Sequence, residues 1–213
     1  IRSDDEQFLN LLKGAKSIAL LTSPTANADI VSAMLAFYHL FKNTERKITL
    51  VVPEAVPPPC QNLPESSVIR SDLGPKNLII SLDTKGSSIS KISYAQEGGI
   101  FNLTIHPKER SFEIEKIRYS YEGDKFDAFI IFGVSKISGL EDLYTKNQKE
   151  FSQIPVVNFD CHTGNEKYGS INLIDESANG MSEALFRKII VWGLVPGREA
   201  AEALLNCIAY KGE

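Results

Sequence analysis

Three side chains able to do chemistry stand next to each other after an apolar run in the second half of the chain. Asp160, Cys161 and His162 follow residues 154–159, which have the length and apolar character of a buried strand. In open α/β sheets the ligand crevice lies at the carboxyl ends of the strands. Asp160 and His162 could therefore act as a general acid–base pair or as metal ligands, because both can turn into one crevice. A structural role is the alternative, in which Asp160 caps the loop and His162 binds a backbone carbonyl.

Cys161 could also be a nucleophile, with His162 as its base. Adjacent side chains usually point apart, and the sequence has no oxyanion motif of the Gly-x-Ser-x-Gly type. We therefore expect Cys161 to be an inert, buried cysteine.

A second group of candidate residues lies in the turn at 22–28, which is rich in small hydroxyl side chains. The turn joins a strand-like run at 17–23 to a helical pattern, and the start of a helix can hold an anion on its free N–H groups. Thr22, Ser23 and Asn27 are therefore candidate ligand-binding residues. The turn has no glycine-rich phosphate loop, so capping of the helix by these side chains explains them equally well.

Strand-like and helical patterns alternate along most of the chain. Continuous apolar runs predict strands at 17–23, 47–52, 77–82, 127–133 and 154–159, and 171–174 is a further short apolar stretch. Apolar residues at helical spacing predict helices at 4–14, 28–42, 140–151, 179–192 and 198–209. This alternation predicts an α/β fold with three layers and a mainly parallel sheet of about five strands. Residues 88–107 differ, since their alternating apolar residues around two glycines predict an inserted β-hairpin.

The predicted sheet places several polar residues at the carboxyl ends of its strands. Asp83 follows the strand predicted at 77–82, and Asn165 lies in the loop that follows Asp160. Asp127 precedes its strand and so falls at the opposite edge. We therefore expect a ligand crevice lined by polar side chains from separate parts of the chain, namely Thr22, Ser23, Asn27, Asp83, Asp160, His162 and Asn165.

The composition is that of an ordinary soluble globular protein. Of the 213 residues, 43% are hydrophobic and 23% are charged, and we expect one domain over 1–213. The net charge of −4 gives no support for binding to duplex DNA, which needs a basic face. Three widely spaced cysteines argue against a disulfide framework or a zinc site and favour a reducing compartment such as the cytoplasm. No apolar run approaches the roughly 18 residues that span a membrane, and the charged start is unlike a signal peptide.

The order of these pieces resembles the DHH phosphoesterase family, in particular its branch of bacterial oligoribonucleases and adenosine-bisphosphate phosphatases. Residues 20–33 stand where the family has His-x-x-Pro-Asp-x-Asp-Ala-x-Gly-Ser, and the strand at 126–133 stands where the family has an apolar strand ending in Asp. Residues 157–165 stand where the family has Asp-His-His-x-x-Asn. The segments at 168–184 and 203–212 resemble those that follow in the family, so the resemblance spans nearly the whole chain.

The resemblance implies a fold whose usual chemistry is two-metal hydrolysis, mostly with manganese, by several carboxylates and imidazoles. In this chain the family's ligand positions fall mostly on other residue types, namely Thr22, Ala26, Ala28, Gly133, Cys161 and, for the last Asp, Tyr210 or Lys211. Asp160, His162 and Asn165 remain. Asp29 lies one place beyond the second expected Asp, on a helix. Active relatives carry a substrate-binding domain after this one, and residues 1–213 contain none.

The resemblance therefore implies a catalytically inactive domain that holds no metal and no cofactor. We expect it to bind a nucleotide or another phosphate compound, or to assemble with a protein partner or a second copy of itself. No membrane partner is expected. The alternative is a divergent manganese-dependent phosphoesterase that acts on short oligonucleotides or nucleotide phosphates. Its rearranged site would use Asp29, Asp83, Asp160 and His162.

Overall fold

The computed structural model describes residues 3–210, and the side chains of residues 3–206. The chain divides into two compact units. The larger one, which we call the α/β unit, consists of Ile1–Gly74 and Lys125–Glu213, and the smaller one, the ribbon unit, is Pro75–Asp124. Among the described residues, no helix is long and apolar enough to cross a lipid bilayer.

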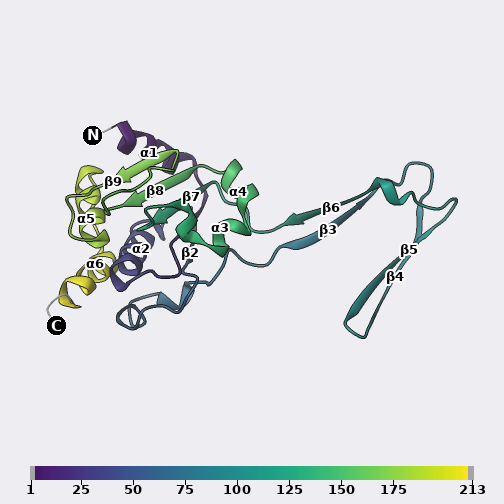
Figure 1. Cartoon of the computed structure of the whole chain (residues 1–213), viewed down its shortest axis with the longest axis horizontal. Coiled ribbons are helices and arrows are strands. Elements are labelled where there is room, and N and C mark those ends of the chain that lie inside the picture. The colour runs from purple at the N-terminus through teal and green to yellow at the C-terminus, as the bar shows by residue number, and fades with distance from the viewer. Residues whose placement is uncertain (1–2, 211–213) are drawn as a thin grey trace. The chain divides into compact units, whose positions relative to one another are not determined.

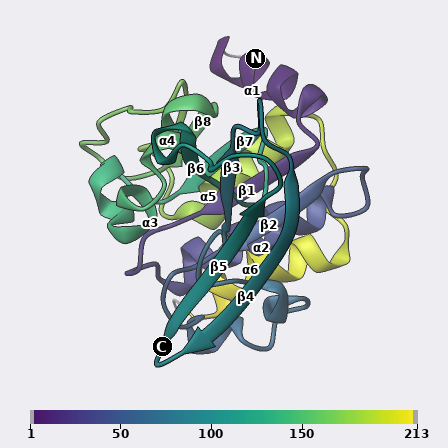
Figure 2. The same ribbon diagram turned by 90° about the vertical axis from the view of Figure 1, so that its right-hand side faces the viewer.

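The α/β unit is built on one sheet of five parallel strands in the order β2-β1-β7-β8-β9. These strands are β1 (Ser17–Leu21), β2 (Lys47–Val51), β7 (Ala128–Phe132), β8 (Val156–Asp160) and β9 (Ile171–Ile174). Figure 1 labels β2, β7, β8 and β9 among the helices of the unit, and Figure 2 labels β1. Every residue of β7 and β8 is buried, as expected for central parallel strands that are covered on both faces. The α/β class and the five-stranded parallel sheet are as predicted.

Side chains of the sheet alternate between two apolar clusters, one on each face. In β7, Ile130 and Phe132 belong to the larger cluster, whereas Phe129 and Ile131 belong to the smaller one. The larger cluster is completed by helices α1 (Ser3–Gly14), α2 (Ala28–Phe41), α5 (Met181–Val191) and α6 (Arg198–Tyr210). The smaller cluster is completed by two short helices, α3 (Asp142–Thr145) and α4 (Gln148–Gln153). The unit therefore has the three layers that the sequence predicted.

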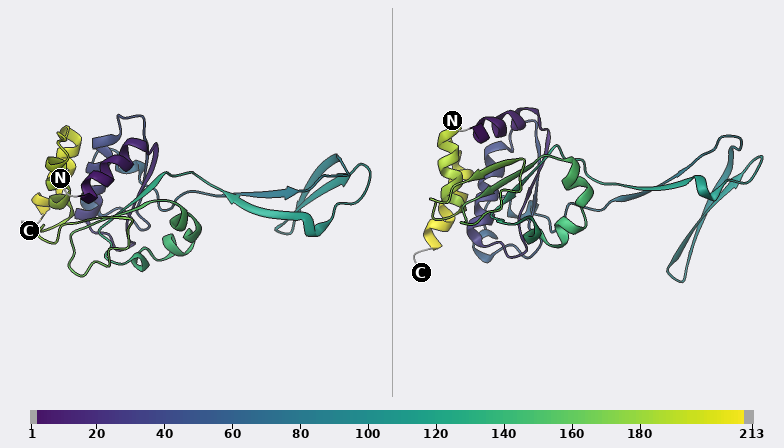
Figure 3. Two further views of the ribbon diagram at one scale, coloured as in Figure 1. Left: turned by 90° about the horizontal axis from the view of Figure 1, so that it is seen from above. Right: turned by 45° about the horizontal axis from the view of Figure 1, so that its top comes forward.

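Four of the helices form where the apolar spacing predicts them, and α5 and α6 lie side by side (Figure 3). The prediction of a single helix at 140–151 is wrong, because α3 and α4 are separate and follow a 3-10 turn at Ile137–Leu140. Asn147 lies between them with a φ of −128°, outside the helical region. Its side chain donates to the carbonyl oxygen of Leu143 at 2.8 Å. This local bond satisfies a carbonyl at the end of α3 and competes with continuation of the helix.

The ribbon unit contains two separate pairs of antiparallel strands. Strand β4 (Ile89–Glu97) pairs with β5 (Ile100–Pro107) across a turn at Gly98 and Gly99, whose φ angles are 58° and 81°. Both glycines therefore adopt the left-handed conformation that a two-residue hairpin turn requires. This hairpin, whose two strands are labelled in Figure 2, is the insertion that the sequence predicts.

Strand β3 (Asn77–Leu82) has a different place from the one predicted. Instead of joining the parallel sheet as a buried strand, it pairs antiparallel with β6 (Ile117–Glu122) in the ribbon unit. Its side chains Leu78 and Ile80 are 55% and 41% exposed. A short apolar run does not by itself distinguish a strand buried on both faces from one strand of a ribbon. Strand β6 was not predicted, although its apolar residues alternate.

Candidate functional site

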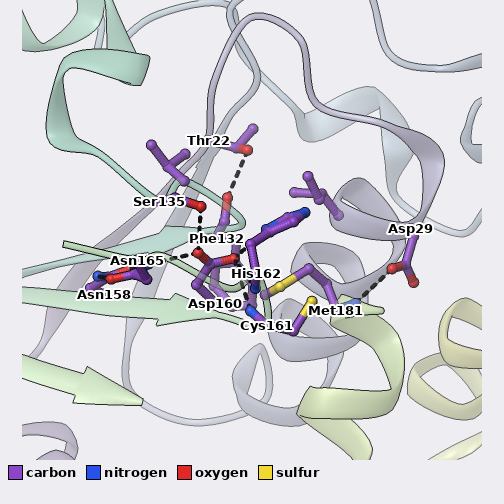
Figure 4. A network of polar contacts seen from close by, with 12 residues as sticks. Thr22, Asp29, Phe132, Ser135, Asn158, Asp160, Cys161, His162, Asn165 and Met181 are labelled. Carbon is purple, nitrogen blue, oxygen red and sulfur yellow. Dashed lines mark hydrogen bonds and ion pairs between the residues drawn. The ribbon is translucent and has the colours of Figure 1, made fainter. Parts of the chain in front are cut away.

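The carboxyl edge of the parallel sheet brings together the residues that follow β1, β7 and β8 (Figure 4). Thr22 follows β1, and its hydroxyl donates to the carbonyl oxygen of Phe132, the last residue of β7, at 2.9 Å. Asp160 is the last residue of β8, the next strand of the sheet. The parallel order of the strands thus places Thr22 and the loop at 160–165 at one edge, as the sequence predicts.

Asp160 is fully buried and accepts five hydrogen bonds. Its Oδ1 accepts from the backbone N–H groups of Cys161 (2.8 Å) and His162 (3.3 Å) and from Nδ1 of His162 (2.6 Å). Its Oδ2 accepts from Ser135 Oγ (3.0 Å) and Asn165 Nδ2 (2.6 Å). A carboxylate offers about four lone-pair sites. These donors therefore leave Asp160 without a free acceptor, and the carboxylate holds the loop around it.

Asn165 links this carboxylate to the interior of the sheet. Its Oδ1 accepts from the side chain of the fully buried Asn158 and from the backbone N–H of Lys167, both at 2.7 Å. Its Nδ2 donates to Asp160. Both ends of the amide are therefore engaged, and the structure gives Asn165 a structural place rather than an open side chain for a ligand.

His162 is the member of this cluster that faces solvent, with 52% of its side chain exposed. Because the Asp160 carboxylate only accepts, we assign the ring proton to Nδ1, which donates to Asp160 at 2.6 Å. The other nitrogen, Nε2, has no hydrogen-bond partner among the residues that the structure describes. An orienting carboxylate of this kind is typical of histidines that act as bases or ligands. His162 is therefore the side chain best placed to meet a ligand.

Tyr168 packs beside the cluster and donates its hydroxyl to the carbonyl oxygen of Val134 at 2.8 Å. Burial raises the pKa of the Tyr168 hydroxyl, and the negative charge of Asp160 raises it further. The phenol therefore stays neutral over the whole physiological pH range and acts as a hydrogen-bond donor.

The three candidates in the turn after β1 differ in what they offer. Thr22 is fully buried, so its side chain has no surface for a ligand. Asn27 is exposed, but its Oδ1 accepts from the backbone N–H of Ile30 at 3.0 Å and so caps α2. Ser23 is partly exposed, and its Oγ lies 3.3 Å from Oγ1 of Thr25. Asn27 therefore caps α2, which is one of the two roles that the sequence left open. Ser23 remains accessible to a ligand.

Asp29 serves a different helix from the one that carries it. Its Oδ2 accepts from the backbone N–H of Met181 at 2.6 Å, and its Oδ1 accepts from that of Ser182 at 3.1 Å (Figure 4). These are the first two residues of α5, whose N–H groups have no partner within the helix. Both oxygens of Asp29 are therefore used to cap α5, where a negative charge is favoured by the helix dipole.

Asp83 does not end a strand of the parallel sheet, because β3 pairs only with β6 in the ribbon unit. The prediction that it shares an edge of that sheet with Asp160 is therefore wrong. Its Oδ1 accepts from the backbone N–H of Lys85 at 2.9 Å. This N–H lowers the pKa of the Asp83 carboxyl, and the positive charges of Lys85, Lys116 and Arg118 act in the same direction.

No model of a known protein family matches this sequence, and no curated protein matches it either. Among solved structures, an exopolyphosphatase-related protein from Bacteroides fragilis is similar to it, with a TM-score of 0.66 and 13% sequence identity. The two proteins therefore share a fold. The match covers 97% of this chain and 49% of the other, so the chain spans about half the length of that protein. At this identity the likeness concerns the fold, and at that level it agrees with the resemblance seen in the sequence.

The residues at the carboxyl edge do not fit the two-manganese centre that the resemblance implies for a phosphoesterase-like fold. Hard divalent cations need several oxygen ligands with free lone pairs. Ala26 and Ala28 provide no ligand atom in their side chains, and Asp160 has no free acceptor. The position of the family's last Asp, at Tyr210 or Lys211, lies outside the residues whose side chains the structure describes.

At Gly133, the apolar side chain of Ile30 fills the space that a metal-binding side chain at this position would need. Gly133 has a φ of +66°, and a Cβ placed on it would lie 2.7 Å from Cδ1 of Ile30. An aspartate at this position would therefore force Ile30 to move. Ile30 is 6% exposed and belongs to the larger apolar cluster, so it has little room to do so. By the resemblance, this is where a metal-binding carboxylate would stand.

Among the described residues, one group of potential metal ligands converges, with the ligand atoms of Asp160, Cys161 and His162 within 4.8 Å of one another. Asp29 does not belong to this group, because both of its oxygens cap α5. The group contains a single carboxylate, which is already saturated. Cys161 is partly buried and packs against the larger apolar cluster, which fits an inert cysteine better than a nucleophile.

Ser135 is the residue of the cluster that the sequence reasoning missed. It lies in the loop after β7, and its hydroxyl binds Asp160 Oδ2. The available signal was a small hydroxyl residue just beyond a central strand, next to the strand that ends in Asp160.

Proposed function

We propose that this chain is a domain of phosphoesterase-like fold that binds a phosphate compound without hydrolysing it. The observation that carries the proposal is the carboxylate of Asp160, whose oxygens accept five hydrogen bonds from protein donors. Metal-assisted hydrolysis requires cations that polarise the phosphoryl group and activate a water molecule. Asp160 is the carboxylate that the family motif retains in this chain, and it holds the loop instead of a cation.

A nucleotide or another phosphate compound is the ligand class that suits the remaining groups. His162 presents Nε2 to solvent at the carboxyl edge of the sheet and is held by Asp160. The N-terminus of α2 follows β1 at the same edge, and a helix N-terminus favours a negatively charged group. Ser23 has a partly exposed hydroxyl in the intervening turn. These groups favour an anion over a neutral ligand.

Activity assays test the absence of hydrolysis. The full chain is incubated with Mn²⁺ and short oligonucleotides, adenosine bisphosphate or cyclic dinucleotides, beside His162→Ala. His106→Ala is a matched control, because His106 is an exposed histidine of β5 in the ribbon unit. We expect equal and negligible turnover from all three proteins. Manganese-dependent hydrolysis that His162→Ala abolishes and His106→Ala preserves would contradict the proposal.

Thermal shifts test the binding itself. A ligand that binds only the folded state raises the melting temperature in proportion to the logarithm of its concentration. We expect stabilisation by nucleotides at millimolar concentration, reduced in His162→Ala and unchanged in His106→Ala. If no nucleotide or phosphate compound stabilises the protein, ligand binding is wrong and assembly is the role that remains.

A divergent phosphoesterase is the second candidate, favoured by one observation. His162 is oriented by Asp160 as a general base would be. Such an enzyme needs a bound cation, so metal analysis of the purified protein separates the two candidates. Retention of about one equivalent of manganese or zinc through dialysis would favour the enzyme.

A further inference from the structure

Each strand pair of the ribbon unit has one mainly apolar face and one mainly polar face. In antiparallel strands, residues directly opposite each other share a face, and successive residues along a strand alternate between faces. One face of the β3–β6 ribbon carries three apolar pairs, namely Leu78 with Tyr121, Ile80 with Tyr119, and Leu82 with Ile117. The charged side chains of Arg118 and Glu122 lie on the opposite face.

The β4–β5 ribbon shows the same division. Its apolar face carries the pairs Ile92 with Ile105, Tyr94 with Leu103, and Gln96 with Phe101. The rings of Tyr94 and Phe101 stack on this face with their centroids 5.8 Å apart. The charged side chains of Lys91 and Glu97 lie on the opposite face. Neither apolar face carries a charge.

Both apolar faces are uncovered. Of their eleven apolar residues, eight are at least 41% exposed, and Tyr94 reaches 75%. Within Pro75–Asp124, all of which the structure describes, Ser87 is the only buried residue. An isolated two-stranded ribbon is at best marginally stable in water and needs a covered apolar face for stability. Uncovered apolar surface on this scale marks an interaction site.

We propose that a second copy of this chain covers these faces, so that the ribbon unit is a dimerisation element. Two identical uncharged faces meet without like-charge repulsion, whereas a charged partner would find no opposite charge to pair with. The core of a homodimer interface is also more apolar than other interfaces. A two-fold contact between copies would place each apolar face against an apolar face, with Arg118, Glu122, Lys91 and Glu97 turned to water.

The available area agrees with a stable dimer. Aromatic side chains bury roughly 150–250 Å² each when fully covered. The four aromatic residues are 60–75% exposed, so they alone offer roughly 500 Å² per copy, and the exposed Leu and Ile side chains add to this area. Each partner buries roughly 800 Å² in a standard interface. This inference is independent of the site at Asp160, because dimerisation and metal binding are measured separately.

Analytical ultracentrifugation of the full chain, over a range of concentrations, tests the proposal. We expect a dimer that Tyr94→Glu and Tyr121→Glu weaken by about tenfold or more in dissociation constant. Ala95→Glu and Ser120→Glu are matched controls, because each is the sequence neighbour on the polar face of the same strand. We expect these controls to change the constant by less than about twofold. Circular dichroism verifies that all variants keep their fold.

A measurement on the unaltered protein makes the test independent of any variant. Hydrogen exchange of the β3–β6 and β4–β5 amides is followed at concentrations above and below dimer dissociation, and we expect protection that is lost on dilution. A chain that stays monomeric at all concentrations overturns the proposal. This holds even if the two ribbons of one chain cover each other, or if their apolar faces bind lipid vesicles. A dimer equally weakened by the variants of both faces, or by neither, overturns it too.

Discussion

The α/β unit and the ribbon unit use apolar residues in opposite ways. In the α/β unit, strands such as β7 bury every side chain between two clusters that lie on the two faces of the sheet. In the ribbon unit, most apolar residues gather on one face of each strand pair, yet Ser87 is the only residue buried. Strand patterning is therefore present in both units, and the difference is the presence of a covering layer. Stability within one chain should reside in the α/β unit.

The largest expected difference between the two units is in the free energy of unfolding that is lost when a large apolar side chain is truncated. Phe132 packs against the rings of Phe37 and Phe159, with centroids 5.8 and 5.1 Å away. We expect Phe132→Ala to lower the free energy of unfolding by about 3–5 kcal/mol. Phe101→Ala in the ribbon unit should change it by less than about 0.5 kcal/mol in dilute protein. Urea unfolding measures both, and comparable losses would refute the difference between the units.

Removal of the Asp160 carboxylate should have the next largest effect. Asp160→Ala leaves the buried donors around it without their acceptor, and we expect a loss of about 3 kcal/mol. Asp127→Ala is the matched control at the opposite edge of the sheet, where Asp127 accepts from the N–H groups of Lys16 and Ser17. Those donors are exposed, so we expect about 1 kcal/mol there. If urea unfolding gives equal losses of free energy for Asp160→Ala and Asp127→Ala, the Asp160 network contributes no more to stability than the exposed bonds of Asp127.

Gly133→Ala tests whether Ile30 occupies the place that the resemblance assigns to a metal-binding carboxylate. The variant combines a positive φ with a close contact, and we expect a loss of about 2–3 kcal/mol. Gly164→Ala is the control, because Gly164 has a φ of +76° and no atom within 4 Å of its Cβ position. It should cost only about 1 kcal/mol for the backbone conformation.

The second half of this test is a double-mutant cycle. Ile30→Ala removes the atoms that crowd position 133, so its combination with Gly133→Ala should cost about 1 kcal/mol less than the sum of the single losses. Strict additivity would show that Ile30 does not block that position.

The smallest expected difference between the units is in how their carboxyl groups contribute to the loss of stability at low pH. Burial alone would raise the pKa of Asp175 in the α/β unit, but hydrogen bonds from Ser177 and the nearby Arg187 outweigh it and lower the pKa. A folded-state pKa below the unfolded value adds stability above about pH 4, which is lost as the pH falls through the folded pKa. Asp175→Asn should therefore flatten the decline in the urea midpoint at low pH.

Asp83 is the control in the ribbon unit for this pH dependence. The pKa of its carboxyl is lowered as well, chiefly by the N–H of Lys85. If the ribbon unit contributes little to global unfolding, Asp83→Asn should leave the pH profile unchanged. A flattening as large as that of Asp175→Asn would show that both units unfold as one.

The sequence predicts most of the α/β unit because its strands are short, wholly apolar runs that alternate with helical spacing. The same rule fails at β3, because the run from Leu78 to Ile80 looks the same whether a helix layer or water covers it. The partner strand, not the run itself, decides which sheet β3 joins. The apolar pattern therefore could not predict where Asp83, which follows β3, lies in the fold.

For the candidate site, the sequence predicts where the residues lie in the fold. It does not predict which neighbouring groups use their hydrogen-bonding atoms or fill the space beside them. Asp160 and His162 lie at the carboxyl edge because they follow a central parallel strand. The donors that saturate Asp160 come from separate loops, at Ser135 and Asn165, and their convergence depends on tertiary packing. The contact between Ile30 and Gly133 likewise joins a helix to a strand end and leaves no local signal.

Manganese binding tests the central claim most directly. Mn²⁺ is titrated into the purified full chain, and the paramagnetic resonance signal of the free ion is recorded with protein and with buffer alone. We expect the two titrations to coincide up to millimolar Mn²⁺, since Asp160 has no acceptor to offer and Ile30 fills the space beside Gly133. Disappearance of about one or two ions per chain from the free signal, restored by His162→Ala but not by His106→Ala, would contradict the account.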